Sequence, residues 1–229
     1  MNNAVREEAI ESLVLLDPES GRRCQSFEEE VANSVSHGVG LAAAVAGACY
    51  LLPHAARRGT AALVGAAIFL GAVLFAYLAS TLYHALPRCR AKHVLRIVEH
   101  MAIFVLIAGT YTPFTLGVLR GPWGWTLFGL IWFLALVGII LKAIGGVRYP
   151  ALAVGLYLGM GWLALVAVKP LWVLMPHRGF FWLFLGGLAY TGGVVFYAVD
   201  HRIRFSHFVW HLFVLAGTSL HFVAIYGYA

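Results

Sequence analysis

The feature that most restricts the fold of this chain is a series of seven apolar stretches, separated by short charged or proline-containing breaks. A helix needs roughly twenty apolar residues to cross the hydrocarbon core of a bilayer, and each stretch has about that length. Only 11% of the residues are charged, against roughly a quarter in a soluble domain. We therefore predict an all-α bundle of seven transmembrane helices, with approximate spans 33–52, 61–84, 95–118, 123–142, 150–168, 180–199 and 206–227.

Acidic residues gather at the start of the chain. Eight of the ten precede residue 33, and we expect residues 1–25 to form a polar, acidic cytoplasmic tail. Ser26 followed by Glu29 has the form of a capping box, in which each side chain bonds the backbone amide of the other residue. A helix is therefore predicted to start there and to enter the membrane, so that residues 26–229 form one seven-helix membrane domain.

The basic residues follow the connections between the apolar stretches. With the N-terminus inside, the tail and connections of the inner side carry eleven Lys and Arg residues, and those of the outer side carry five. Because positive residues accumulate in cytoplasmic loops, we predict a cytoplasmic N-terminus and an external C-terminus. Topology thus explains the net charge of +6, and we expect no nucleic-acid partner. The three cysteines lack the CxxC spacing of a metal site.

Histidines within the apolar stretches are the first candidates for a functional site. His207 and His211 are four residues apart, so on a helix they project from one face and can hold one metal ion. The alternative is a pair of ordinary hydrogen-bonded histidines. His84, at the inner end of the second stretch, lies at the same predicted depth. Together the three would form a catalytic type of zinc site, with three imidazoles and an open fourth position. His221 lies about 15 Å further along its helix, too far to share that ion.

Two other polar residues are catalytic candidates at this depth. Glu99 is the only carboxylate well inside a predicted membrane helix, and it could orient or deprotonate a zinc-bound water. The alternative for Glu99 is an ion pair with Arg96 or Arg90 at the end of the helix. Ser80 shares a helix face with His84, although a hydrogen bond to the carbonyl four residues earlier is the more ordinary role of a helical serine.

The motifs that carry these residues, in order, are Glu30-x-x-Asn33-x-x-Ser36-His37-Gly38, Ser80-x-x-x-His84, Glu99-His100 followed by Ala108-Gly109-Thr110-Tyr111-Thr112-Pro113, and Ser206-His207-x-x-x-His211 with His221 ten residues later. In this order they resemble the bacterial hemolysin III proteins, the prokaryotic branch of the progestin and adipoQ receptor family, over residues 28–225. The resemblance implies a cytoplasmic N-terminus and a zinc ion near the cytoplasmic face, held by His84, His207 and His211. The family usually has Asp where this chain has Glu99, so the longer side chain leaves open whether the carboxylate contacts the water directly or through a bridge.

The resemblance also implies a chemistry. Some eukaryotic relatives are associated with ceramidase-like amide hydrolysis, and we therefore expect a zinc-dependent hydrolase of lipid amide or ester bonds in the inner membrane of a bacterium. Two alternatives give zinc a structural role: a pore-forming or cytolytic protein, and a sensor of membrane lipid state. A third alternative is a bis-histidine haem protein. Gly155-x-x-x-Gly159 offers a close-packing face for a homo-oligomer. The sequence assigns no role to Glu30, Asn33, His37, His100 and His221.

Overall fold

Helices make up the regular structure of the protein. A computed structural model describes residues 23–87, 89–146 and 149–229. The segments are α2 (Phe27–Arg58), α3 (Thr60–Ala85), α4 (Arg90–Leu116), α5 (Pro122–Gly145), α6 (Pro150–Trp162), the 3₁₀ turn η1 (Leu163–Ala167), α7 (Val168–Leu174), α8 (His177–Ala198) and α9 (Ser206–Tyr228). With Pro150–Leu174 counted as one span, seven helical segments among the described residues are long and apolar enough to cross a membrane. The predicted seven-helix bundle is confirmed.

Several helices begin earlier than the apolar stretches that predicted them. α2 starts at Phe27, and Ser26 and Glu29 form the predicted capping box in full. α4 starts at Arg90, five residues before the predicted span. Charged turns stay helical beyond the apolar part of each span, because a helix does not need apolar residues where water meets its end. The predicted acidic tail falls mainly on residues 1–22, which lie outside the described residues, and the predicted orientation of the termini stays a prediction.

The fifth span differs from its prediction. The span predicted to end at residue 168 extends further, because helix α7 continues through Lys169 and Pro170 to Leu174. Pro170 is the third residue of α7, and the first turn of a helix tolerates proline since its amide hydrogens have no partner within the helix. Within this span the α-helix is interrupted by the 3₁₀ turn η1. There the Tyr111 hydroxyl accepts a hydrogen bond from the Ala164 amide and donates one to the Met160 carbonyl at 2.8 Å.

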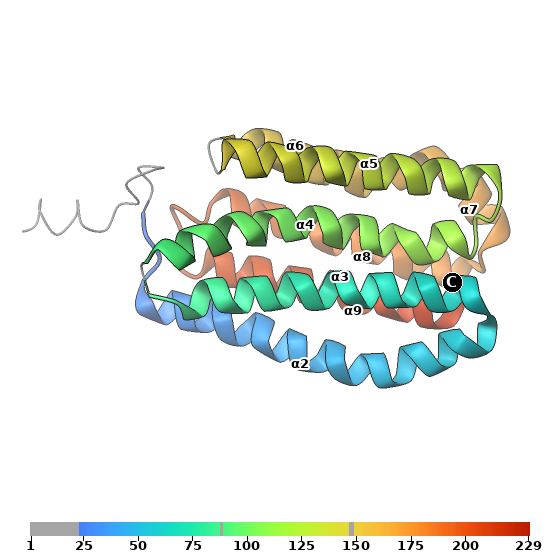
Figure 1. Ribbon diagram of the computed structural model, residues 1–229, viewed down its shortest axis with the longest axis horizontal. Coiled ribbons are helices and arrows are strands. Elements are labelled where there is room, and N and C mark those ends of the chain that lie inside the picture. The colour runs from blue at the N-terminus through green and yellow to red at the C-terminus, as the bar shows by residue number, and fades with distance from the viewer. Residues whose placement is uncertain (1–22, 88, 147–148) are drawn as a thin grey trace, which may run out of the picture.

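Helices that follow one another in the chain pack side by side, and α2 packs against α9, so that the first and last spans close the bundle. Figure 1 shows the start of α2 at one end of the bundle and the C-terminus at the other. A single residue, Gly59, connects α2 to α3, and its φ of 114° is a conformation that glycine adopts without strain. The largest buried cluster, which includes Phe69, Val73 and Ile225, lies between α3, α9 and the neighbouring helices.

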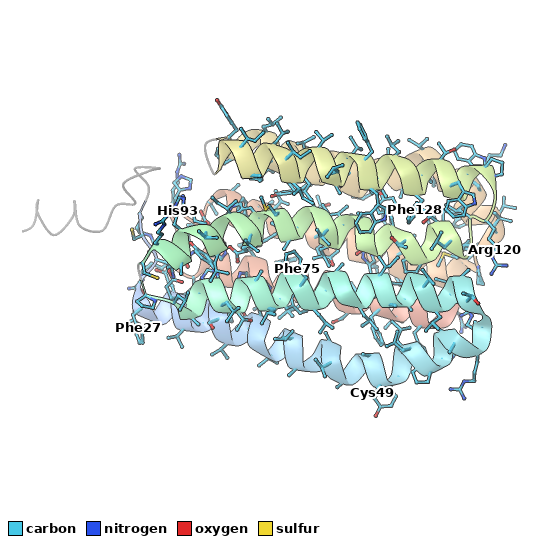
Figure 2. All side chains as sticks on the ribbon, viewed as in Figure 1. Phe27, Cys49, Phe75, His93, Arg120 and Phe128 are labelled. Carbon is cyan, nitrogen blue, oxygen red and sulfur yellow. The ribbon has the colours of Figure 1, made fainter. Side chains whose placement is uncertain are left out.

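The outer surface of the bundle is apolar. Large hydrophobic side chains such as Phe133, Ile144 and Val195 are exposed, as expected of helices whose outer faces contact lipid. Figure 2 places Phe27 and His93 at one end of the bundle and Arg120 at the other. The end marked by Phe27 is the one that holds the polar side chains described next.

Candidate metal centre

Four helix ends bring the candidate residues together. The start of α2 carries Asn33, Ser36 and His37, and these side chains are buried. The end of α3 carries Ser80 and His84, the start of α4 carries Glu99 and His100, and the first two turns of α9 carry His207 and His211. Residues up to 180 positions apart in the chain therefore share one end of the bundle, as their predicted depth required.

One ligand atom from each of His84, Glu99, His207 and His211 lies within 4.8 Å of the other three. The imidazole rings of the three histidines have centroid separations of 4.8 to 5.2 Å. His84 Nε2 is 3.4 Å from Glu99 Oε1. Three imidazoles and a carboxylate at these separations can surround a single metal ion, so the structure brings together the three predicted ligands and adds Glu99 as a fourth donor.

In each of the three imidazoles, the Nδ1 atom has a hydrogen-bond partner that holds the ring. The Nδ1 atom of His84 is 2.7 Å from a Glu30 carboxylate oxygen, and that of His207 is 3.0 Å from Asp200 Oδ2. The Nδ1 atom of His211 lies 3.0 Å from the Ser36 hydroxyl oxygen and 3.2 Å from the Asn33 carbonyl. Carboxylates and carbonyls accept hydrogen bonds, and the Ser36 hydroxyl already donates to the Asn33 carbonyl at 2.8 Å. This arrangement assigns the proton to Nδ1 in all three rings and leaves the Nε2 lone pairs available to a metal. Metal-binding histidines are oriented in this way in known metalloproteins.

The free nitrogens supply a test of whether a metal fits. The Nε2 atoms of His84 and His207 are buried and have no hydrogen-bond partner among the described residues. A buried polar atom without a partner costs about 1–3 kcal/mol, and a bound cation would remove that cost at both positions. The residues present therefore fit a metal ion. Ordinary hydrogen bonding does not account for the unpaired His207 Nε2, and the polar contact of His84 Nε2 on that side is the long 3.4 Å approach to Glu99.

His37 lies against this group without belonging to it. Its ring stacks on that of His211 with a centroid distance of 3.7 Å and an interplanar angle of 7°. On its other side the ring of Tyr77 lies 4.9 Å away. Neither nitrogen of His37 has a hydrogen-bond partner among the described residues. Packed between two rings, His37 fixes the plane of the His211 imidazole.

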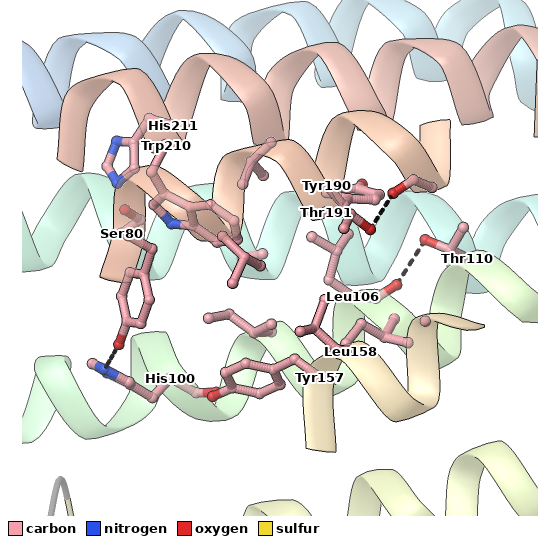
Figure 3. A pocket seen from close by; sticks show the side chains of 18 of the residues that line it. Ser80, His100, Leu106, Thr110, Tyr157, Leu158, Tyr190, Thr191, Trp210 and His211 are labelled. Atoms are coloured by element: carbon pink, nitrogen blue, oxygen red, sulfur yellow. Dashed lines mark hydrogen bonds between the residues drawn. The ribbon is translucent and has the colours of Figure 1, made fainter. Parts of the chain in front are cut away.

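Three members of the donor group, Glu99, His207 and His211, line one wall of a cavity of about 130 Å³, shown in Figure 3. Apolar and aromatic side chains such as Ile103, Leu158 and Trp210 make most of the remaining wall. His100 also lines the cavity; its Nδ1 is 2.6 Å from the Arg96 carbonyl, and its Nε2 is 3.1 Å from the Tyr197 hydroxyl. The cavity therefore joins a polar end at the donor group to an apolar interior.

Ser80 faces this cavity, and the hydrogen bond expected along its own helix is absent. Its Oγ atom is buried and has no partner within the described part of the chain. The i−4 interpretation of Ser80 is therefore wrong. His221 lies apart from the donor group, as predicted, and its Nε2 donates to the Leu183 carbonyl at 3.0 Å. Gly155 and Gly159 have open space where a side chain would project, so the homo-oligomer stays a prediction.

Comparisons with known proteins agree with this architecture. The model of the family described as "Haemolysin-III related" matches residues 25–222, which include every residue of the donor group. The chain belongs to the haemolysin-III-related family. It is 43% identical over 204 residues to the "Hemolysin-3 homolog" of Bacillus subtilis (strain 168), covering 89% of this chain and 95% of the relative. It is 41% identical over 208 residues to the "Hemolysin-3" of Bacillus cereus, covering 90% and 94%.

A weaker similarity reaches a human protein. This haemolysin-III-related protein is 29% identical over 218 residues to the human "Monocyte to macrophage differentiation factor", covering 92% of this chain and 89% of the relative. The resemblance inferred from the motifs is confirmed. One residue that contacts the donor group in this haemolysin-III-related protein was not predicted, namely Asp200, whose carboxylate is 3.0 Å from His207 Nδ1. The sequence could have drawn attention to Asp200, because Asp200 and Glu99 are the only acidic residues after residue 33.

Proposed function

We propose that this protein is a zinc-dependent hydrolase of lipid amide or ester bonds, acting near the cytoplasmic face of a bacterial inner membrane. The observation that supports it most is the position of the donor group, which lies inside a membrane bundle at the polar end of an apolar cavity. A lipid can bring its reactive carbonyl to such a group while its hydrocarbon chain stays out of water. Catalytic groups at the boundary of a water-poor cavity act more strongly than they do in water.

The donor set favours zinc. Neutral imidazole nitrogens and a carboxylate oxygen are ligands that zinc accepts, and sites with two or three histidines and one position for water are typical of hydrolytic zinc. When bound, the ion would polarise a carbonyl oxygen and lower the pKa of a bound water to about 7. His84, His207 and His211 would hold it through the Nε2 atoms that their partners leave free.

The remaining residues have roles that follow from their positions. Glu99 lies 3.4 Å from His84 Nε2 and is the carboxylate best placed to accept the proton of the attacking water and return it to the leaving nitrogen or oxygen. Ser80 has an unpaired hydroxyl on the cavity wall and is available to hydrogen-bond the substrate. The apolar side chains of the cavity bind hydrocarbon and exclude water.

The test combines metal analysis with a ceramide-hydrolysis assay on detergent-purified protein. We expect about one zinc per wild-type chain, none in the His84→Ala, His207→Ala, His211→Ala triple variant, and hydrolysis that follows the metal. Glu99→Gln should keep the zinc and lose hydrolysis. Activity that persists in Glu99→Gln would remove Glu99 as the proton carrier, and zinc without hydrolysis of ceramide or of an ester analogue would refute the enzymatic proposal.

A lytic function is the second candidate, because two bacterial relatives carry the word "Hemolysin" in their names. In that case the metal would be structural, with Glu99 as its fourth ligand. Release of a dye from liposomes that contain the protein, at equal rates in wild type and Glu99→Gln, would favour this candidate over hydrolysis.

A further inference from the structure

Glu29 is a buried carboxylate that touches none of the metal donors. Only 2% of the residue is exposed. Its Oε2 accepts hydrogen bonds from Arg23 Nη1 at 2.6 Å and from the Ser26 amide at 2.9 Å. Its Oε1 accepts from Arg23 Nη2 at 2.8 Å and from the Phe205 amide at 2.8 Å. The pKa of the Arg23 guanidinium lies above its ordinary value because of its bond to Glu29. One ion pair thus joins the start of α2 to the residue before α9.

The loop between α8 and α9 is tied to this ion pair at both ends. At one end, Arg23 Nη2 donates to the Asp200 carbonyl at 3.3 Å. At the other end, Glu29 accepts a hydrogen bond from the Phe205 amide. Phe205 has a φ of 58°, the only positive φ of a non-glycine residue in the described ranges. Such a conformation costs roughly 1–2 kcal/mol for a residue with a side chain, so it requires contacts that hold it in place.

The same loop determines how His207 is oriented. The Asp200 carboxylate accepts the proton of His207 Nδ1 at 3.0 Å, and Phe205 lies two residues before His207. The other two imidazoles are held by residues of the α2 helix itself, His84 by Glu30 and His211 by Asn33. His207 alone is oriented from a loop. Its position therefore depends on whatever fixes that loop.

We propose that the Arg23–Glu29 ion pair is a positioning element of the metal site, which acts through the α8–α9 loop and Asp200 to direct His207 Nε2 toward the ion. Glu29 is also part of the capping box of α2, so a purely structural role in starting that helix is the competing explanation. The two explanations differ in what they predict for the metal. The positioning role requires that loss of the ion pair weaken the His207 ligand specifically.

The experiment compares Glu29→Gln with Glu28→Gln in full-length protein in detergent, with Co²⁺ as the probe. Glu28→Gln is the matched control, because it removes the same charge from the same helical turn. The Glu28 side chain is exposed, and its ion pair with the exposed Arg204 is long, at 3.9 Å. Residues that orient metal ligands typically contribute 10–100-fold to affinity. We expect a loss of about that size in Glu29→Gln, with a changed Co²⁺ visible spectrum as one nitrogen ligand is lost, and no change in Glu28→Gln.

A double-mutant cycle separates positioning from simple stabilisation. If Glu29 acts through Asp200, then Glu29→Gln should cost little further affinity in an Asp200→Asn background, because the two residues act on one ligand. Additive losses, or wild-type affinity in Glu29→Gln, would overturn the proposal. Should Glu29→Gln fail to fold, Arg23→Gln removes the bonds to Glu29 and to the Asp200 carbonyl while it leaves the capping box, and the same outcomes apply.

This inference rests on the metal site of the proposed function but not on hydrolysis. Absence of Co²⁺ and Zn²⁺ binding in wild-type protein would overturn the site and the inference together. Metal binding that is unaffected by Glu29→Gln would overturn the inference alone and leave the hydrolase proposal standing.

Discussion

Replacement of His211 by alanine should abolish the effect of a chelator on thermal stability. His211 is 1% exposed, supplies one of four clustered donor atoms, and is fixed by the Asn33 carbonyl on one side and the His37 ring on the other. A ligand that binds only the folded state stabilises it by an amount set by its concentration relative to its Kd. The variant loses one of the four clustered donors, so this stabilisation should disappear.

The size of the effect follows from linkage. At a free metal concentration 1,000 times the Kd, the bound ion stabilises the folded state by about 4.1 kcal/mol. For a chain of this length each kcal/mol shifts Tm by about 2–4 °C, so removal of the metal from wild type should lower Tm by about 8–16 °C. The assay is thermal unfolding of detergent-solubilised protein with and without a chelator.

The control is His221→Ala. His221 is on the same helix and is also buried, but it lies outside the donor group. His221→Ala should lower stability through lost packing and keep the full chelator-dependent shift. His211→Ala should have a low Tm that the chelator does not change. A chelator-dependent shift of wild-type size in His211→Ala would refute the assignment of this histidine as a ligand.

Three other outcomes are expected. Glu30→Gln removes the charged partner of His84 and should lower metal affinity by about 10–100-fold, measured by competition with a chromophoric chelator. Gly138→Ala places a methyl group against the buried Phe104 ring and should destabilise the protein by about 1–3 kcal/mol in thermal unfolding, whereas Gly129→Ala, with open space around it, should not. Liposomes that contain wild-type protein should retain a trapped dye, since most of the side chains that line the cavity are apolar and do not favour a water-filled channel; rapid release would contradict this and favour lysis.

Local patterns in the sequence were sufficient for the framework of the fold. Hydropathy predicts the seven spans because each crossing needs its own apolar stretch, and the Ser26–Glu29 capping box involves only neighbouring residues. The 3₁₀ turn η1 inside the fifth span was not predicted, because one of its contacts is distant in the chain. The hydroxyl of Tyr111 on α4 accepts a hydrogen bond from the Ala164 amide in that turn.

The metal site shows the same division between local and distant causes. Spacing along one helix predicts that His207 and His211 act together, and predicted depth adds His84. The roles of Asp200 and Glu29 depend on how the α8–α9 loop folds back onto the start of α2. No pattern along the chain encodes that approach, so the residues that orient the ligands could not be assigned before the structure was known.

The α2 helix contributes no member of the four-donor group, yet Glu30 and Asn33 hold two of the imidazoles directly and Glu29 reaches the third through the loop. The first described span is therefore the frame on which candidate ligands from α3 and α9 are oriented. Until α9 packs against α2, the site lacks both His207 and His211 in their final positions. A metal ion could then bind only after these distant helices have met, so metal binding would report that the bundle has closed.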